Sequence, residues 1–435
     1  MLPILAISAL ILGAAPARAQ IPARDRYVVL ISIDGFPAYA LDDPRLPAPT
    51  LRRLAAGGAV ARGMRPVNPT VTWPNHTSMV TGVDPSVHQV LFNGMLVKAT
   101  PTSPPRVDPW VDKAQMVHAA TVYDLAFRAG LTTAQVDWVA ITNPGTITWE
   151  FAERPSLNGA IEKEMIAAGE ATESDIVEFH ASSGAWRDQM WTRAAAFIMR
   201  RHKPNLLLYH LLNLDSIHHT YGPRTPAGLT GIALADSRVA EIVEAARAAG
   251  TFDRTTFFVV SDHGFKTVKH TIHAAAAAKQ AGLEGVTVIA EGGTALAYVN
   301  DPAERSALVP KLKQALARIE GVSHVYEPAE YGSLGLPPAA RSSQGPDLLA
   351  AAADGYGFAG GTEGPIVTEQ AQGGSHGYLA SDPEMNELFI AFGRGIRPGT
   401  KLDVIRNLDL APTIAVLLGL KMEGTAGSPL RVALQ

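Results

Sequence analysis

The sequence contains no cysteine among its 435 residues. Disulfide bonds and thiolate metal ligands are therefore excluded, and so is lipidation of a cysteine after an export signal. Exported proteins without cysteine are common, so this absence neither supports nor opposes secretion. It does mean that any transition metal must be held by histidine and carboxylate side chains.

Long runs of charge of one sign are also missing. Charged residues make up 18% of the chain and hydrophobic residues 47%, and the formal net charge is −4. This composition is typical of a packed globular protein and argues against a disordered chain. Without a basic run, no nucleic-acid scaffold is expected as a partner, and any nucleotide would be a small-molecule substrate.

Only the N-terminus has a long apolar run. Met1 to Pro16 is apolar and ends in a helix-breaking proline, and Ala17-Arg18-Ala19 follows as an A-x-A cleavage pattern. The run is shorter than the about 20 residues that span a bilayer, so no stable membrane anchor is expected. We predict a signal peptide over residues 1–19 and a periplasmic or secreted protein beginning near Gln20. Because Lys and Arg are missing before the run, the alternative is an apolar helix packed on the domain.

Strand patterns alternate with helix patterns along most of the chain. Tyr27–Ile33 (YVVLISI) is a continuous apolar run, as expected for a strand buried on both faces. Further strands are predicted at Thr132–Val136, Asn205–Tyr209, Thr256–Val260, Val286–Ile289 and Leu388–Ala391. Helices are predicted at Thr50–Ala56, Thr121–Ala129, Trp186–Arg201, Pro226–Ala249, Ala303–Ile319 and Leu408–Leu418. This alternation predicts an α/β fold with a mainly parallel central sheet and helices on both faces.

The chain is longer than the roughly 250–300 residues that one hydrophobic core usually serves. We predict a large domain over residues 20–264 and 375–435, with a smaller insertion or cap at residues 265–374. Turns rich in Gly, Pro and Ala interrupt the strand–helix alternation in that insertion. The stretch Ala99–Trp110, rich in Pro, Thr and Ser, is predicted to be a surface loop.

Aspartate and histidine residues gather near the ends of the predicted strands. They are Asp34 after the first strand, Asp215 and His219 after Asn205–Tyr209, Asp262 and His263 after Thr256–Val260, and His376 before Leu388–Ala391. Alone, such an aspartate is usually a turn or helix cap. Together, at the carboxyl edge of a parallel sheet where ligands collect, three Asp and three His can form two metal sites of mixed oxygen and nitrogen ligands.

A hydroxyl group suited to nucleophilic attack lies in Pro69-Thr-Val-Thr72-Trp-Pro-Asn-His76. At a helix start, Thr72 can lie beside backbone N–H groups that stabilise an anion. A free threonine is a poor nucleophile, so this role requires a metal that lowers the pKa of the hydroxyl. The alternative is that Thr72 only caps the helix.

These motifs, in this order, resemble the alkaline phosphatase superfamily, and specifically its nucleotide pyrophosphatase/phosphodiesterase family. The resemblance extends from Tyr27 to about Leu420. It is carried by Asp34-Gly35, Pro49–Leu54, Arg62–Pro66, Thr72–His76, Thr81-Gly82, Asp215–Pro223, Ser261–Gly264 and His376–Tyr378. It implies an alkaline phosphatase-like fold and a metal-dependent hydrolase of phosphoester bonds that acts through a covalent phosphothreonine.

The resemblance also implies two divalent metal ions. One would be held by Asp215, His219 and His376, and the other by Asp34, Asp262, His263 and the oxygen of Thr72. His218 is the rival of His219, but the pattern His-x-x-Gly-Pro favours His219. Zinc suits mixed His/Asp ligation better than magnesium, which prefers oxygen ligands.

Two further residues are expected at the substrate. Asn93, in Phe92-Asn93-Gly94, matches the family's asparagine that donates to a phosphoryl oxygen. His88-Gln89-Val90 replaces the usual His-Gly-Ile of the family, and this departure can shift the loop that carries Asn93. Trp73 stands where Phe is more usual, and it either contacts a substrate group or anchors the nucleophile turn in the core.

A diester substrate is favoured over a monoester. Related single-chain monoesterases supply a Lys-x-Arg pair, whereas Gln135–Trp149 contains neither Lys nor Arg, and Arg154 lies just beyond. The alternatives are a phosphomonoesterase or phosphonate hydrolase of the same superfamily, or a catalytically inactive secreted binding protein. A sulfatase is set aside because its Cys or Ser-x-Pro-x-Arg nucleophile site is missing. The sequence implies no oligomeric state.

Overall fold

The computed structural model describes residues 21–98 and 105–435. The predicted signal peptide and the first part of Ala99–Trp110 lie outside the described residues. Within the described part of the chain, no helix is both long and apolar enough to cross a membrane.

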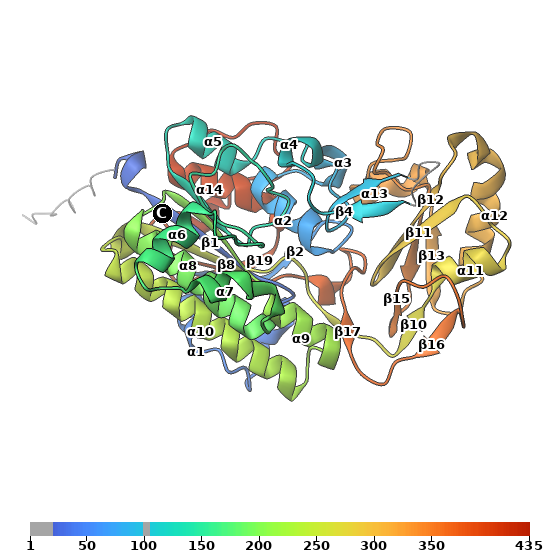
Figure 1. Ribbon diagram of the computed structural model, residues 1–435, viewed down its shortest axis with the longest axis horizontal. Helices are drawn as coiled ribbons and strands as arrows, with labels where there is room; N and C mark the ends of the chain where they lie inside the picture. The colour runs from blue at the N-terminus through green and yellow to red at the C-terminus, as the bar shows by residue number, and fades with distance from the viewer. Residues whose placement is uncertain (1–20, 99–104) are drawn as a thin grey trace, which may run out of the picture.

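An eight-stranded sheet forms the centre of the larger part of the molecule (Figure 1), in the order β19-β2-β18-β8-β1-β7-β5-β6. Its strands are β1 (Tyr27–Ile33), β2 (Ala59–Arg65), β5 (Thr133–Val136), β6 (Trp149–Phe151), β7 (Leu206–Leu211), β8 (Thr255–Val260), β18 (Phe389–Gly393) and β19 (Thr400–Arg406). Only β18 runs antiparallel to its neighbours, while the other described pairings in this sheet are parallel. The predicted mainly parallel sheet is confirmed.

Strand β1 explains why helices cover both faces of the sheet. Val29, Ile31 and Ile33 pack into one hydrophobic core, whereas Val28 and Leu30 pack into another on the opposite face. The first core includes α1 (Pro49–Gly57), α8 (Gly184–Arg201) and α10 (Pro226–Ala248), and the second includes α2 (Thr72–Thr81), α5 (Val122–Arg128) and α14 (Leu410–Leu418). Full burial of such a side chain stabilises the fold by about 1.5–3 kcal/mol, so a strand that is apolar on both faces must be covered twice.

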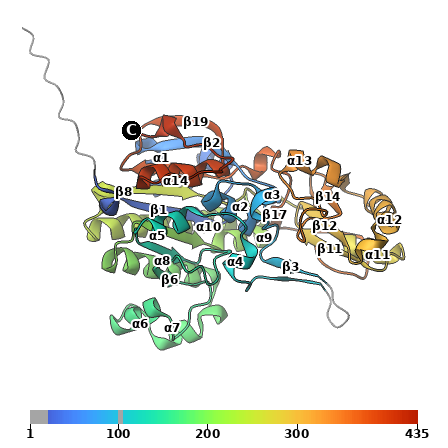
Figure 2. The ribbon, with the colours of Figure 1, turned by 90° about the horizontal axis from the view of Figure 1, so that it is seen from above.

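A second group of elements lies at one end of the molecule, beside the large sheet (Figures 1 and 2). It contains a four-stranded antiparallel sheet and a three-stranded sheet. The elements are β10 (His270–Ile272), α11 (Ala274–Gln280), β11 (Val286–Glu291), β12 (Thr294–Val299), α12 (Arg305–Ala317), β13 (Val322–Tyr326), β14 (Leu348–Ala352), β15 (Tyr356–Phe358) and β16 (Val367–Glu369). Its hydrophobic core is formed by residues between Ile272 and Val367. We propose that this unit is the insertion predicted at residues 265–374, because it has its own core.

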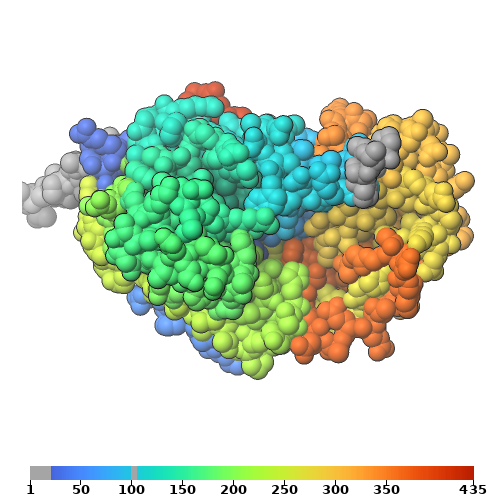
Figure 3. Space-filling view, in the orientation of Figure 1, coloured from blue at the N-terminus to red at the C-terminus, as the bar shows by residue number. Residues whose placement is uncertain are grey.

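The segment that carries Asn93 is attached to this second unit. Gln344 accepts a hydrogen bond from the backbone N of Leu96 at 2.7 Å and donates to its carbonyl at 3.1 Å. Phe92 and Leu96 pack against Leu296 of β12. In the space-filling view, the cyan part of the chain lies between the green part and the yellow and orange unit (Figure 3).

One part of the predicted surface loop Ala99–Trp110 is a strand instead. Arg106–Asp108 forms β4, which pairs antiparallel with β3 (Met95–Val97). The prediction of a loop was wrong there, because the Pro, Thr and Ser content describes only local preference, whereas β4 depends on hydrogen bonds to β3. Short helices connect the remaining elements: α3 (Pro85–His88), α4 (Lys113–Met116), α6 (Ala160–Ala167), α7 (Glu173–Val177) and α13 (Tyr331–Leu334).

Candidate active site

The predicted aspartates and histidines lie at the carboxyl edge of the central sheet. Asp34 directly follows β1, and Asp262 and His263 follow β8. Asp215 lies in α9 (Asn213–Tyr221), which begins just after β7. His376 follows the short strand β17 (Gly374–Ser375), which pairs with β9 (Lys266–Thr267). Because β1, β7 and β8 are parallel neighbours, their ends bring together residues that are far apart in sequence.

The turn after β1 requires glycine at position 35. Gly35 has a φ of +67°, and a Cβ there would lie 3.0 Å from the Phe265 ring and 3.3 Å from the Cα of Asp215. Its backbone N donates to Oδ1 of Asp262 at 3.0 Å. The absence of a side chain therefore lets the chain turn, lets α9 approach closely, and orients a second aspartate.

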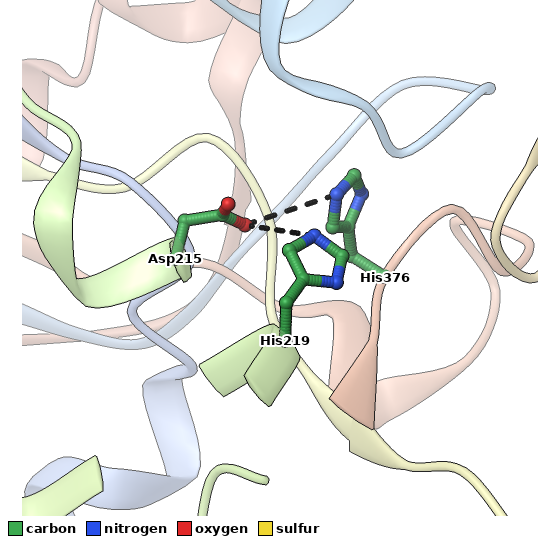
Figure 4. Close-up of side chains that lie close together, drawn as sticks. All are labelled: Asp215, His219 and His376. Carbon is green, nitrogen blue, oxygen red and sulfur yellow. Dashed lines mark ion pairs between the residues drawn. The ribbon is translucent and has the colours of Figure 1, made fainter. Parts of the chain in front are cut away.

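Asp215, His219 and His376 form the first group of potential metal ligands (Figure 4). Asp215 and His219 are four residues apart on α9, so their side chains share one face of the helix. Nε2 of His219 lies 3.4 Å from Oδ1 of Asp215, and Nε2 of His376 lies 3.8 Å from the same oxygen. Figure 4 shows both rings approaching this carboxylate from different elements.

The rival histidine has a different neighbour. His218 is fully buried, and its Nδ1 donates to the carbonyl of Gly35 at 3.1 Å. His219, which the His-x-x-Gly-Pro pattern favours, is the histidine that the geometry groups with Asp215 and His376.

Asp34, Asp215 and His263 form a second group, whose ligand atoms lie within 4.8 Å of one another. Nε2 of His263 lies 3.2 Å from Oδ1 of Asp34 and 3.4 Å from Oδ2 of Asp262. The resemblance placed Asp262 here, and Asp262 does contact His263. The geometry adds that Asp215 belongs to both groups, which makes it the residue that joins them.

The three histidines share a hydrogen-bond pattern that suits metal binding. Their Nδ1 atoms lie 3.2, 3.1 and 2.9 Å from backbone carbonyls, His219 at Gly374, His263 at Gly264 and His376 at Thr70. When Nδ1 donates to a carbonyl, the neutral ring keeps a lone pair on Nε2, which here points at the carboxylates.

Several buried polar atoms at this site have no hydrogen-bond partner among the described residues. They are Oδ1 of Asp34, Oδ1 of Asp215, Oδ2 of Asp262 and Nε2 of His263. An unpaired buried polar atom is unfavourable, and most such atoms in proteins have a partner. Four of them converging on one place, all potential metal ligands, fit cations placed between them.

The pKa shifts of the cluster reflect an excess of buried negative charge. Burial, together with the charge of Asp34, raises the pKa of Asp262 to about 7. Burial alone would lower the pKa of His263, but the charges of Asp262 and Asp34 outweigh it and raise that pKa to about 9. Divalent cations would offset this charge, since they stabilise the ionised carboxylates.

Thr72 is the first residue of α2, a helix whose residues are all buried. The residue at the cap position is Val71, and no side chain caps this helix. The alternative that Thr72 serves as the helix cap is therefore wrong. Thr72 lines a cavity of about 350 Å³ that is also lined by Asp34, Asp215, His219 and His376. The N-terminal end of the helix dipole gives this position a positive partial charge.

Asn93 and Trp73 line the same cavity. Oδ1 of Asn93 accepts from the backbone N of Trp73 at 3.0 Å, which leaves the Nδ2 group to donate elsewhere. Gln89 adopts a left-handed φ of 69° and donates to the carbonyl of Ser86 at 2.8 Å, so the turn forms without glycine. Trp73 packs against Val90 and is 7% exposed, so it is both a core anchor and a cavity wall.

The sequence-based interpretation missed two buried residues, His210, which contacts Asp34, and Asp137, which contacts His210. His210, in β7, has Nε2 3.0 Å from Oδ2 of Asp34. Asp137, directly after β5, lies on the other side of the His210 ring, with Oδ2 3.0 Å from Nδ1. Signals for both existed: Asp137 ends a strand as Asp34 does, and His210 is the polar residue in the otherwise apolar run Leu206–Leu211.

Burial alone would lower the pKa of His210. Hydrogen bonds and charges of Asp137 and Asp34 outweigh that effect and hold the pKa of His210 well above its usual value. For Asp34, burial favours the neutral form, but the hydrogen bond from His210 and the nearby charges of His263 and His210 lower its pKa well below the usual value. Asp34 is thus held as a carboxylate by a histidine on each side.

Residues 28–379 match the profile of the family described as type I phosphodiesterase / nucleotide pyrophosphatase. The matched region begins in β1, includes every residue of both ligand groups, and ends just after His376. The chain belongs to this family.

Curated members of the family are similar to this chain at low identity. Human ectonucleotide pyrophosphatase/phosphodiesterase family member 7 is 24% identical over 436 residues, which cover 97% of this chain and 86% of that protein. Human family member 1 is 23% identical over 247 residues, covering 55% of this chain and 23% of that protein. Venom phosphodiesterase 2 of Crotalus adamanteus is 23% identical over 247 residues, covering 55% of this chain and 27% of that protein. The chain thus matches about a quarter of the length of these last two relatives.

Solved structures of the family share the fold. Human ectonucleotide pyrophosphatase/phosphodiesterase 5 superimposes with a TM-score of 0.70 at 19% identity, covering 93% of this chain and 97% of that chain. The murine protein, as an inactive threonine-to-alanine variant in complex with AMP, gives a TM-score of 0.73 at 18% identity and covers 94% and 100% of the two chains. The predicted alkaline phosphatase-like α/β fold is confirmed.

Proposed function

We propose that this member of the family is a metal-dependent phosphodiesterase or nucleotide pyrophosphatase that forms a covalent phosphothreonine on Thr72. One observation carries the proposal. Thr72, at the start of the buried helix α2, lines the same cavity as Asp34, Asp215, His219 and His376, which belong to two converging groups of potential ligands. The complex of a structural relative with AMP supports a small phosphoester, such as a nucleotide, as the substrate.

The residues fit two divalent ions. Asp215, His219 and His376 would hold one, and Asp34, Asp262 and His263, with the oxygen of Thr72, would hold the other. Asp215 also lies within reach of the second position, because its carboxylate is grouped with Asp34 and His263. Bound there, such ions lower the pKa of a hydroxyl and offset negative charge on phosphoryl oxygens. Zinc is the ion that we propose, because both groups mix imidazole nitrogen with carboxylate oxygen.

The reaction would proceed by two displacements at phosphorus. In the first, Oγ of Thr72 loses its proton and bonds to phosphorus, while the bond to the leaving alcohol or nucleotide breaks and the leaving oxygen takes up a proton. In the second, water attacks phosphorus and its proton returns to the departing Oγ of Thr72, which releases a phosphomonoester. Nδ2 of Asn93 would donate to a phosphoryl oxygen, and the positive end of the α2 dipole would stabilise its negative charge.

A preference for diesters is the test of this function. We expect kcat/KM to be roughly tenfold higher, or more, for p-nitrophenyl thymidine monophosphate than for p-nitrophenyl phosphate. A monoester carries about two negative charges near neutral pH and profits from extra cationic groups. Among the described residues that line the cavity, Arg154 is the only Lys or Arg, and its guanidinium lies 4.0 Å from the Trp110 ring centroid. Release of p-nitrophenol at matched pH and metal content gives both rates.

Other outcomes of that assay identify the alternatives. Faster turnover of the monoester would indicate a phosphomonoesterase, and faster turnover of a p-nitrophenyl phosphonate ester would indicate a phosphonate hydrolase. No turnover of any ester by metal-loaded protein would indicate a binding protein. Arg154→Gln keeps a planar group near Trp110 without the charge, so it should lower kcat/KM for the monoester more than for the diester. Arg154→Lys returns a positive charge and should bring the ratio of the two kcat/KM values back toward that of the wild type.

We also propose that the protein is exported. The apolar run Met1–Pro16 and the A-x-A pattern support this proposal, and the similar curated proteins are named ectonucleotide enzymes. Native protein isolated from cells is expected to begin at Gln20 or close to it. Intact-mass measurement gives the first residue directly, and a mature protein that still carries Met1 would contradict cleavage.

A further inference from the structure

We propose that His210 and Asp137 are positioning residues for Asp34, which determine the single carboxylate oxygen that Asp34 presents to a metal ion. The inference rests on the proposed two-metal site. Both residues lie outside the two ligand groups. Their substitution is expected to affect the metal position that includes Asp34 and to leave the other position unchanged.

The His210 ring is clamped between two carboxylates in the interior. It is 2% exposed, and its Nε2 donates to Oδ2 of Asp34 at 3.0 Å. On its other side, Nδ1 lies 3.1 Å from the Asp137 carbonyl oxygen and 3.0 Å from Oδ2 of the same residue. The register of β1 with β7 pairs Ser32 with His210, which places the histidine beside the end of the strand that carries Asp34. Both ring nitrogens therefore face acceptors, and the ring orientation is determined.

Because of this contact, the two carboxylate oxygens of Asp34 have different surroundings. Oδ2 is occupied by His210, whereas Oδ1 lies 3.2 Å from Nε2 of His263 and has no hydrogen-bond partner among the described residues. Only Oδ1 is left for a cation, so Asp34 would bind with one oxygen. A carboxylate that is already oriented loses less conformational freedom when it binds a metal.

In Asp262, too, one carboxylate oxygen is hydrogen-bonded and the other is unpaired, but its partners are backbone groups. Its Oδ1 accepts from the backbone N of Gly35 at 3.0 Å and from that of His263 at 3.1 Å, and its Oδ2 has no partner among the described residues. Backbone groups thus orient Asp262, whereas side chains orient Asp34. The position of Asp34 can therefore be disturbed by substitution of a side chain.

Asp137 completes the arrangement from β5. It has a left-handed φ of 55°, is 1% exposed and lines the cavity. Aspartate adopts this conformation more readily than most residues. The conformation turns both its carbonyl oxygen and its carboxylate toward Nδ1 of His210, so that the ring is held on the side opposite Asp34.

The test is the metal affinity of each position in the full chain. Metal-free wild-type protein, titrated with zinc against a competing chelator, is expected to bind two ions. His210→Ala should keep the ion at Asp215, His219 and His376, while the affinity of the other position falls roughly 10–100-fold. His210→Gln restores an amide donor near Oδ2 of Asp34 and should recover most of that affinity, and Asp137→Asn should cause a smaller loss.

His218→Ala is the matched control. His218 is also a fully buried histidine next to this site, but its Nδ1 bonds to the Gly35 carbonyl and not to a carboxylate. We expect both ions to bind with nearly wild-type affinity. If His210→Ala does not fold, the comparison of His210→Gln and Asp137→Asn with wild type decides the question.

Two results would overturn the inference, and they are distinct. If His210→Ala binds both zinc ions with wild-type affinity, or if it does not fold and both His210→Gln and Asp137→Asn do so, the positioning role is wrong while the proposed function stands. If wild-type protein itself binds fewer than two ions, the proposed function fails and the inference fails with it. If His210→Ala lowers the zinc affinity of both metal positions equally, His210 has a general structural role, and this result would also contradict the inference.

Discussion

Replacement of Thr72 by alanine is expected to lower kcat for a diester by roughly three to six orders of magnitude, because the residue that bonds to phosphorus is removed. Thr72 begins α2 and lines the cavity that Asp34, Asp215, His219 and His376 also line, so it lies next to members of both ligand groups. Metal content should remain close to the wild-type value, because Asp and His supply most ligands. Steady-state release of p-nitrophenol and elemental analysis of the same samples give both quantities.

Three further measurements make the Thr72 test specific. Thr72→Ser retains a hydroxyl and should keep measurable activity. Thr77→Ala removes a buried hydroxyl from the same helix but outside the cavity, and should change kcat by less than about threefold. Acid quenching during turnover should leave phosphate or a phosphoester on Thr72, which is detectable by mass spectrometry. Near-normal turnover by Thr72→Ala would disprove the nucleophile and leave the metal sites untouched.

Removal of metal ions is the second change with a large expected effect. Chelation should lower the rate by at least roughly three orders of magnitude, because the pKa of the Thr72 hydroxyl then stays near its ordinary high value. Zinc should restore activity better than magnesium, since both groups contain histidine nitrogen. Elemental analysis of active protein is expected to give two transition-metal ions per chain.

The shared aspartate provides a sharper version of this test. Asp215 belongs to both ligand groups, whereas His219 belongs to one. Asp215→Asn should therefore weaken both metal positions, and His219→Asn only one. Zinc at about 100 times its dissociation constant should stabilise the wild-type fold by about 2.7 kcal/mol per ion, an increment that chelation removes. Fully active protein with fewer than two ions per chain would contradict the two-metal proposal.

Much of the fold follows from local patterns in the chain. The run Tyr27–Ile33 has no polar face, so it had to be a strand covered on both sides, and β1 has these bounds. Other strands escaped prediction. β19 (Thr400–Arg406) has exposed or half-buried residues throughout, since it lies at the edge of the sheet, and it therefore lacks a strong apolar signal.

For the candidate site, the amino-acid types and their places near the predicted strand ends pointed to the six Asp and His residues, and the resemblance to the family supplied their proposed roles and that of Thr72. A parallel sheet brings the carboxyl ends of its strands to one edge, so the sequence order of these motifs already implied that they meet. The histidine tautomers, by contrast, follow from the carbonyls of Gly374, Gly264 and Thr70, which belong to other segments of the chain.

By itself, then, the sequence determined the fold class, the family and the list of potential ligands, because these depend on patterns of burial and on residue type along the chain. Only the tertiary structure decided that Asp215 joins both groups, that His219 rather than His218 lies beside it, and that His210 and Asp137 hold Asp34. Each of these contacts joins residues from different strands or helices. Their distances depend on how the strands pair and on how closely Gly35 lets α9 approach β1. The spacing of residues along the chain does not specify either of these.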